Sequence, residues 1–135
     1  MNKQFFISLL FALITFVILG GLFGNFVFLP EFATWHEAYP DAVRETPDFV
    51  SGFVLGLLQL IAFVVLLPKL QITSGSGAAM FGAVYSVVIW LIVDLQMVSV
   101  TNIVSYEYVL KDALLSAVMG AILGVVVSWS QRRFA

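Results

Sequence analysis

The sequence predicts an all-α membrane protein, a bundle of four antiparallel transmembrane helices. Of its 135 residues, 61% are hydrophobic and only 10% are charged, whereas soluble domains have roughly 45 to 50% apolar and 25% charged residues. The mean hydropathy is +1.07. The few charges separate four apolar stretches, each long enough for the roughly 20 residues that cross a bilayer. We therefore expect a single polytopic membrane domain over residues 1–135.

The first helix is expected at about residues 5–29. Pro30 should end it, because proline lacks a backbone N–H and disturbs a helix interior. A signal peptide is the alternative, but the apolar run is too long for one and no Ala-x-Ala site follows. Beyond Pro30, we expect Phe32, Trp35 and Tyr39 to anchor an outer loop at the membrane interface.

The second helix is expected at about residues 47–67. Thr46 is suited to cap it, Pro47 to its first position, and Asp48 to its positive end, whereas Pro68 marks the exit.

The third and fourth helices are expected at about residues 77–100 and 106–130. A turn-rich segment, residues 71–77, precedes the third helix. Ser105 is a suitable cap for the fourth, with Glu107 and Lys111 spaced as an i, i+4 pair in its first turn.

The basic residues predict that both termini are cytoplasmic. One side of the membrane would carry Lys3, Lys69, Arg132 and Arg133, and the other side only Arg44 and Lys111. The loop of residues 31–48 contains five acids and one base, which agrees with an outer location. We expect a multi-pass protein of the cell membrane, in the bacterial inner membrane.

Small residues recur at helical spacing in every expected span. They let helices approach closely in lipid, where apolar side chains gain little from burial. The alternative is that one stripe, best that of the fourth helix, contacts another subunit or a second copy. The expected helix-packing glycines are Gly20, Gly24, Gly52, Gly56, Gly82, Gly120 and Gly124.

Gln59 and Ser86 are candidate polar residues at the centre of the membrane. Helix arithmetic places them at the same depth as Thr15 and Gly120. An unpaired amide in hydrocarbon is costly, so we expect Gln59 to pair with Ser86 or Thr15. The alternative is a ligand contact.

Asp94 is the only acid that we place within a span. It is expected near the outer headgroup boundary, with Lys111 as its ion-pair partner. The alternative is a proton or cation site, since ionisable groups inside membranes are often functional.

The sequence contains few residues of the kinds that form metal sites, haem sites or catalytic triads. The chain has no cysteine and one histidine, His36, so a metal site, a haem held by two histidines of one chain and a catalytic triad are not expected. We expect no cofactor, no enzymatic activity and no binding to nucleic acid, because there is no basic face.

Two segments resemble parts of small bacterial four-helix membrane proteins of unknown function. They are residues 20–35, with Gly20-Gly21-Leu22-Phe23-Gly24, and residues 112–129, with Gly120-Ala121-Ile122-Leu123-Gly124. The resemblance implies the same layout and names no functional residue.

The sequence therefore favours a protein that acts through helix association, as an accessory or stabilising subunit of a larger membrane complex. Its partners would be the bilayer and other membrane subunits or itself. The alternative is a small homo-oligomeric transporter or channel, with Gln59, Ser86 and Asp94 along its path.

Overall fold

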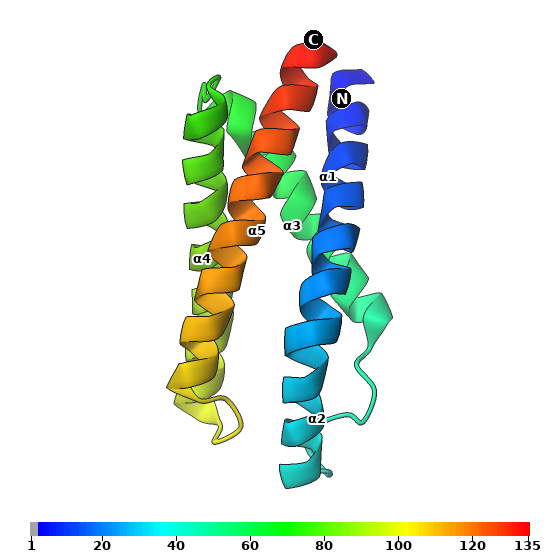
Figure 1. Cartoon of the computed structure of the whole chain (residues 1–135), viewed down its shortest axis with the longest axis vertical. Coiled ribbons are helices and arrows are strands. Elements are labelled where there is room, and N and C mark those ends of the chain that lie inside the picture. The colour runs from blue at the N-terminus through cyan, green and yellow to red at the C-terminus, as the bar shows by residue number, and fades with distance from the viewer. Residues whose placement is uncertain (1–2) are drawn as a thin grey trace.

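The structure is a computed structural model that describes residues 3–135, and it is helical with short connections (Figure 1). Its elements are α1 (Lys3–Phe23), the π-helical turn η1 (Gly24–Phe28), α2 (Leu29–Ala38), α3 (Phe49–Lys69), α4 (Gly75–Val100) and α5 (Tyr106–Arg133). The segment Lys3–Ala38 is continuous, and with α3, α4 and α5 it makes four helices long and apolar enough to cross a membrane. The described chain is therefore that of a multi-pass, all-helical membrane protein.

The prediction that the first helix ends at Leu29 was wrong. The helix continues through Pro30 to Ala38, and the widened turn η1 lies directly before the proline. The Leu29 N–H bonds to the carbonyl of Gly24, five residues back instead of four. This shift in the hydrogen-bond ladder accommodates the missing N–H of Pro30 without breaking the helix. Of the expected interfacial anchors, Phe32 and Trp35 therefore lie on α2 and Tyr39 at its end, whereas residues 40–48 do form a loop.

Side-chain caps begin the other three helices. Asp48 caps α3 and accepts hydrogen bonds from the backbone N–H groups of Val50 and Ser51, so the assignment of the cap to Thr46 was wrong. Ser74 caps α4. Ser105 caps α5 by accepting from the Tyr108 N–H at 3.2 Å, as predicted.

The tightest helix contact joins α4 and α5 through glycine. A Cβ atom added to Gly82 would overlap the carbonyl of Gly120, and one added to Gly124 would overlap the carbonyl of Ala78. The backbones of the two helices therefore touch along this line, which is the close approach that small residues permit in a membrane.

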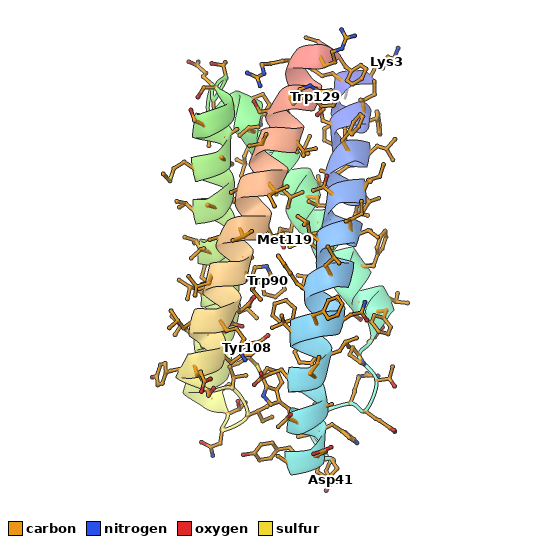
Figure 2. All side chains as sticks on the ribbon, in the orientation of Figure 1. Lys3, Asp41, Trp90, Tyr108, Met119 and Trp129 are labelled. Atoms are coloured by element: carbon orange, nitrogen blue, oxygen red, sulfur yellow. The ribbon has the colours of Figure 1, made fainter. Side chains whose placement is uncertain are left out.

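The two ends of the chain lie together at one end of the molecule, and Lys3 and Asp41 mark its opposite ends (Figures 1 and 2). At the terminal end, the Gln4 amide donates to the Gln131 carbonyl at 2.6 Å, and the Gln131 amide donates to the Val64 carbonyl at 3.1 Å. These bonds tie α1, α3 and α5 together.

Helix α3 belongs to only one of two apolar clusters. The cluster toward the termini combines Leu60, Phe63 and Val64 of α3 with residues of α1, α4 and α5. The cluster at the other end is centred on Tyr108 and Val109 and receives no residue from α3. Figure 1 shows α3 crossing obliquely behind the other helices. In its N-terminal half, α3 therefore stands apart from α4 and α5.

The glycine contact predicts unequal effects of two matched substitutions. Gly120→Ala should lower the free energy of unfolding by about 1 to 3 kcal/mol, because its Cβ meets the Gly82 backbone. Gly20→Ala should leave it unchanged or raise it by up to about 1 kcal/mol, because nothing lies within 4 Å of the added atom. Unfolding in mixed micelles, followed by circular dichroism, measures both, and equal effects would contradict the packing.

The cap of α3 predicts a pH-dependent helix start. Hydrogen bonds from the Ser51 hydroxyl and backbone lower the pKa of Asp48, which is fully exposed. Because the folded pKa is depressed, the cap's contribution is complete above the ordinary Asp pKa and is lost as the pH falls through the folded value. The protection factors of the Val50 and Ser51 amides, each rate being referred to the intrinsic exchange rate at the same pH, should therefore fall in Asp48→Ala at neutral pH and in the native protein only in acid. Asp41→Ala is the control, and unchanged protection in Asp48→Ala would refute the cap.

Candidate functional site

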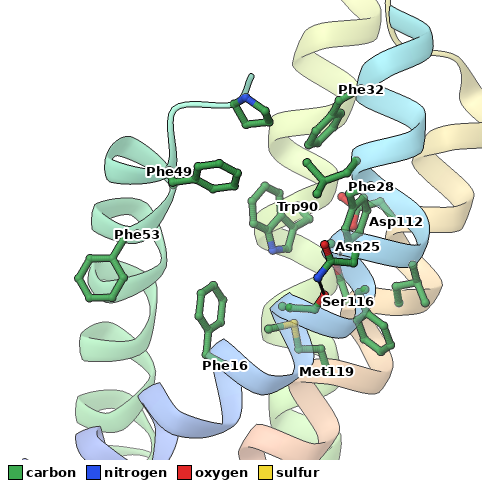
Figure 3. A pocket seen from close by; sticks show the side chains of 18 of the residues that line it. Phe16, Asn25, Phe28, Phe32, Phe49, Phe53, Trp90, Asp112, Ser116 and Met119 are labelled. Carbon is green, nitrogen blue, oxygen red and sulfur yellow. Dashed lines mark hydrogen bonds between the residues drawn. The ribbon is translucent and has the colours of Figure 1, made fainter. Parts of the chain in front are cut away.

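A cavity of about 460 Å³ lies in the half of the molecule where α3 stands apart. Its walls come from α1, η1 and α2, from the start of α3, and from α4 and α5 (Figure 3). Eight of its twenty lining residues are aromatic, and Figure 3 labels Phe16, Phe28, Phe32, Phe49, Phe53 and Trp90 among them. The volume falls within the roughly 300 to 1,000 Å³ of small-molecule sites.

Glycines widen this cavity. Gly20, Gly24 and Gly52, which we expected at helix contacts, line the cavity and have nothing within 4 Å of an added Cβ. Gly56 is different, because an added Cβ would lie 2.6 Å from the Phe16 ring. The glycines thus divide into those at contacts and those along an open wall.

Two buried acids meet beside the cavity. Asp112 of α5 lines it and is 4% exposed. Asp94 of α4 is 5% exposed and does not line the cavity itself, but it lies beside Asp112. The Ser116 hydroxyl donates to Asp112 Oδ1 at 3.2 Å. Asp94 Oδ2 is buried without a hydrogen-bond partner among residues 3–135. We call Asp94 and Asp112 the acid pair.

The expected ion pair between Asp94 and Lys111 is not formed. Lys111 instead bonds to Glu31 of α2 at 3.0 Å. This partner was missed because Glu31 was assigned to a loop, whereas the continued helix carries it past the start of α5. Lys111 also points away from Asp112, since consecutive helical residues are about 100° apart. The acid pair therefore has no basic partner here.

Aromatic rings cover the acid pair on the side of α2. Trp35 packs edge-on against Tyr108 with ring centroids 4.7 Å apart, and Phe28 meets Tyr108 at 6.3 Å. Tyr108 is buried, one helical turn before Asp112. Water is thus partly excluded from the acids by rings that the extension of the first helix supplies.

Asn25 is a further polar residue of the cavity wall, and it lies in the π-helical turn. Its amide donates to the Gly21 carbonyl at 2.8 Å. Figure 3 shows Asn25 on the same side of the cavity as Asp112 and Ser116. Short π-helical turns occur frequently at functional sites.

Gln59 and Ser86 do not line the cavity. The expected bond from Gln59 to Ser86 or Thr15 is also not formed, because Thr15 donates to its own helix at Phe11 and Gln59 Oε1 is buried without a partner in the described chain. The Gln59 backbone carbonyl accepts from the Tyr85 hydroxyl at 3.0 Å. Ser86 packs against Gly120.

His36 lies at the end of α2, and its Nδ1 is 2.7 Å from the Val43 carbonyl. This contact holds the loop after α2 against the helix. Within residues 3–135, no three His, Cys, Asp or Glu side chains gather as a metal-binding group.

Asp112 is the site residue that the sequence reasoning missed. From the sequence it entered only as the first residue of the segment 112–129 that resembles other membrane proteins. A usable signal was present, because Asp112, Ser116, Gly120 and Gly124 repeat every four residues and so share one helix face. If the stripe of small residues on α5 is continued by one helical turn from Ser116, Asp112 faces the neighbouring helices.

No protein-family model, curated protein or solved structure matches this chain, so its function has to be argued from the geometry above.

Proposed function

We propose that the chain crosses the cell membrane four times as an antiparallel bundle with both termini in the cytoplasm. The support is the distribution of basic residues. Lys3, Lys69, Arg132 and Arg133 belong to the end where Gln4 bonds to Gln131, and bases favour the cytoplasmic side. The cavity then opens in the outer half of the membrane.

We further propose that the protein binds a lipophilic small molecule in this cavity, as a binding protein or a small transporter. The observation that carries the proposal is an aromatic-lined space of about 460 Å³ with Asp112, Ser116 and Asn25 on its wall. Apolar walls with a few polar groups are typical of ligand sites. Glycine is less favourable than alanine in a helix by roughly 0.5 to 1 kcal/mol, so open glycines along a wall suggest that space itself is useful.

An accessory role in a larger complex is the competing proposal, in which a partner's helix would occupy the same space. An apolar helix seated there would leave Asp112 and Asn25 facing hydrocarbon, which is costly. We therefore favour a small molecule with a polar group. Catalysis is not part of the proposal.

The topology predicts opposite labelling of two cysteine variants. The chain has no cysteine of its own, so single cysteines report cleanly. In intact spheroplasts, a membrane-impermeant maleimide should label Asp41→Cys, and it should label Ala135→Cys only after lysis. The reverse pattern would refute the orientation.

The cavity predicts saturable quenching of Trp90, which lines it. We would use the variant Trp35→Phe/Trp129→Phe in nanodiscs and two isosteric probes, neutral 4-bromoneopentylbenzene and the 4-bromobenzyltrimethylammonium ion, because bromine quenches tryptophan at contact. At least one probe should quench saturably. Gly20→Leu, whose side chain enters the cavity, should raise the apparent Kd of that probe at least tenfold. Ala33→Leu on the exposed face of α2 should leave this Kd unchanged.

Linear, unsaturable quenching that Gly20→Leu does not change would refute the ligand site. Co-purification of a stoichiometric membrane protein whose helix crosslinks to position 20 would instead favour the accessory subunit.

A further inference from the structure

We infer that the acid pair recognises a lipophilic, singly charged ammonium ion, which enters in exchange for a proton. The inference rests on the proposed ligand site and names its ligand class. It starts from two buried carboxyl groups that lie together. While both are ionised, Asp94 Oδ2 receives no hydrogen bond from residues 3–135. A buried acceptor without a donor is costly, and a cation or a proton satisfies it.

Helical spacing directs two faces toward this point. On α4, Trp90 and Asp94 are four residues apart and lie one above the other. On α5, Tyr108, Asp112 and Ser116 are also spaced by four residues. Each helix thus presents an aromatic ring and a carboxyl group together, and the glycine contact between α4 and α5 holds the two faces against each other.

The charges around the site select a cation. The charged or titratable groups near it are Asp94 on α4, Asp112, Tyr108 and Lys111 on α5, Glu31 on α2, and Asp48 with its neighbour Arg44 before α3. Of the two bases, Lys111 is neutralised by Glu31 at 3.0 Å, and Arg44 interacts with Asp48. The wall from α1 and η1 contributes the neutral Asn25. The acids therefore lack a positive partner in the surrounding chain.

The composition of the wall selects an organic cation over a metal ion. Ca²⁺ takes six to eight oxygen ligands, and the described chain gathers no third His, Cys, Asp or Glu at the pair. Aromatic rings, by contrast, attract ammonium groups through their faces, and aromatic cages for quaternary ammonium ions are a known use of this attraction. Trp90, Tyr108 and Phe28 supply such faces beside Asp112. An ammonium with a hydrocarbon body satisfies both the acids and the rings.

Exchange with a proton follows from the closeness of the two acids. Two carboxylates side by side in a medium of low dielectric repel each other, so a proton stabilises the pair when no ligand is bound. An ammonium ion bound at the same place supplies the positive charge instead, and the proton leaves to solution. Proton and ligand therefore compete, and by linkage the ligand binds more tightly as the pH rises.

The test uses the Trp90-only protein in nanodiscs and the two isosteric probes between pH 5 and 8. The apparent Kd of the 4-bromobenzyltrimethylammonium ion should fall with rising pH, by up to about tenfold per unit for one-for-one exchange. The Kd of 4-bromoneopentylbenzene should not change with pH. Asp94→Asn and Asp112→Asn should each weaken the cation at least tenfold and flatten its pH dependence.

Controls separate the acid pair from general acidity and from folding. Asp41→Asn removes an exposed carboxyl group that does not line the cavity, so it should retain the pH dependence. Unchanged quenching by the neutral probe in Asp94→Asn and Asp112→Asn would establish that these variants remain folded. A variant that fails this check would be replaced by Asp→Glu at the same position, which should keep cation binding.

Three outcomes would overturn the inference. The first is equal, pH-independent binding of both probes, which would leave the ligand site intact but refute the role of the acids. The second is cation binding that neither asparagine variant weakens. The third is displacement of the cation by NaCl but not by choline chloride, which would assign the pair to an inorganic cation. Failure of both probes to bind would refute the proposed function itself.

Discussion

The structure depends on the backbone contact between α4 and α5. Gly82, Gly120 and Gly124 leave no room for side chains between the two helices, so the helix axes approach closely. In lipid, such packing is among the few forces that hold helices together, because burying more apolar surface gains little. The contact also has a chemical consequence. It carries Asp94 and Asp112 into the same buried layer, where neither forms an ion pair with a base among residues 3–135. A wider spacing would have left room for water between them.

The cavity results from the different way in which α3 is attached. Near the termini, α3 is held by Leu60, Phe63 and the bond from Gln131 to the Val64 carbonyl. Toward its N-terminus it has no such contacts, and the gap is bordered by glycines on both α1 and α3. The closely packed helices α4 and α5 and the divergent helix α3 thus leave a space between them, which α1, η1 and α2 complete.

The spans and most of their limits were accessible from the sequence, because hydropathy and charge are properties of local segments. Ser105 was a correct cap for the same reason. The continuation past Pro30 was not accessible, since it depends on a π-helical turn that no single residue signals. Only one member of the acid pair could be identified from the sequence. Asp94 stood out as a charge inside a span, but Asp112 was not recognised as its neighbour. Lys111 was taken as the partner because it was expected at a similar depth in the membrane.

The errors at Pro30 and at Asp94 have one cause. Had the first helix ended at Leu29, Glu31 would have been a loop residue and Lys111 would have remained available to the nearest acid. The π-helical turn keeps the helix intact and thereby brings Glu31 to Lys111, at 3.0 Å. That ion pair occupies Lys111, the residue before Asp112 in the chain, while Trp35 of the same extension packs against Tyr108. The extended helix therefore does more than lengthen a span, because it gives Lys111 its partner and places a ring against Tyr108, one turn before Asp112. In this chain, the backbone irregularity before a proline determines which carboxylate pairs with Lys111.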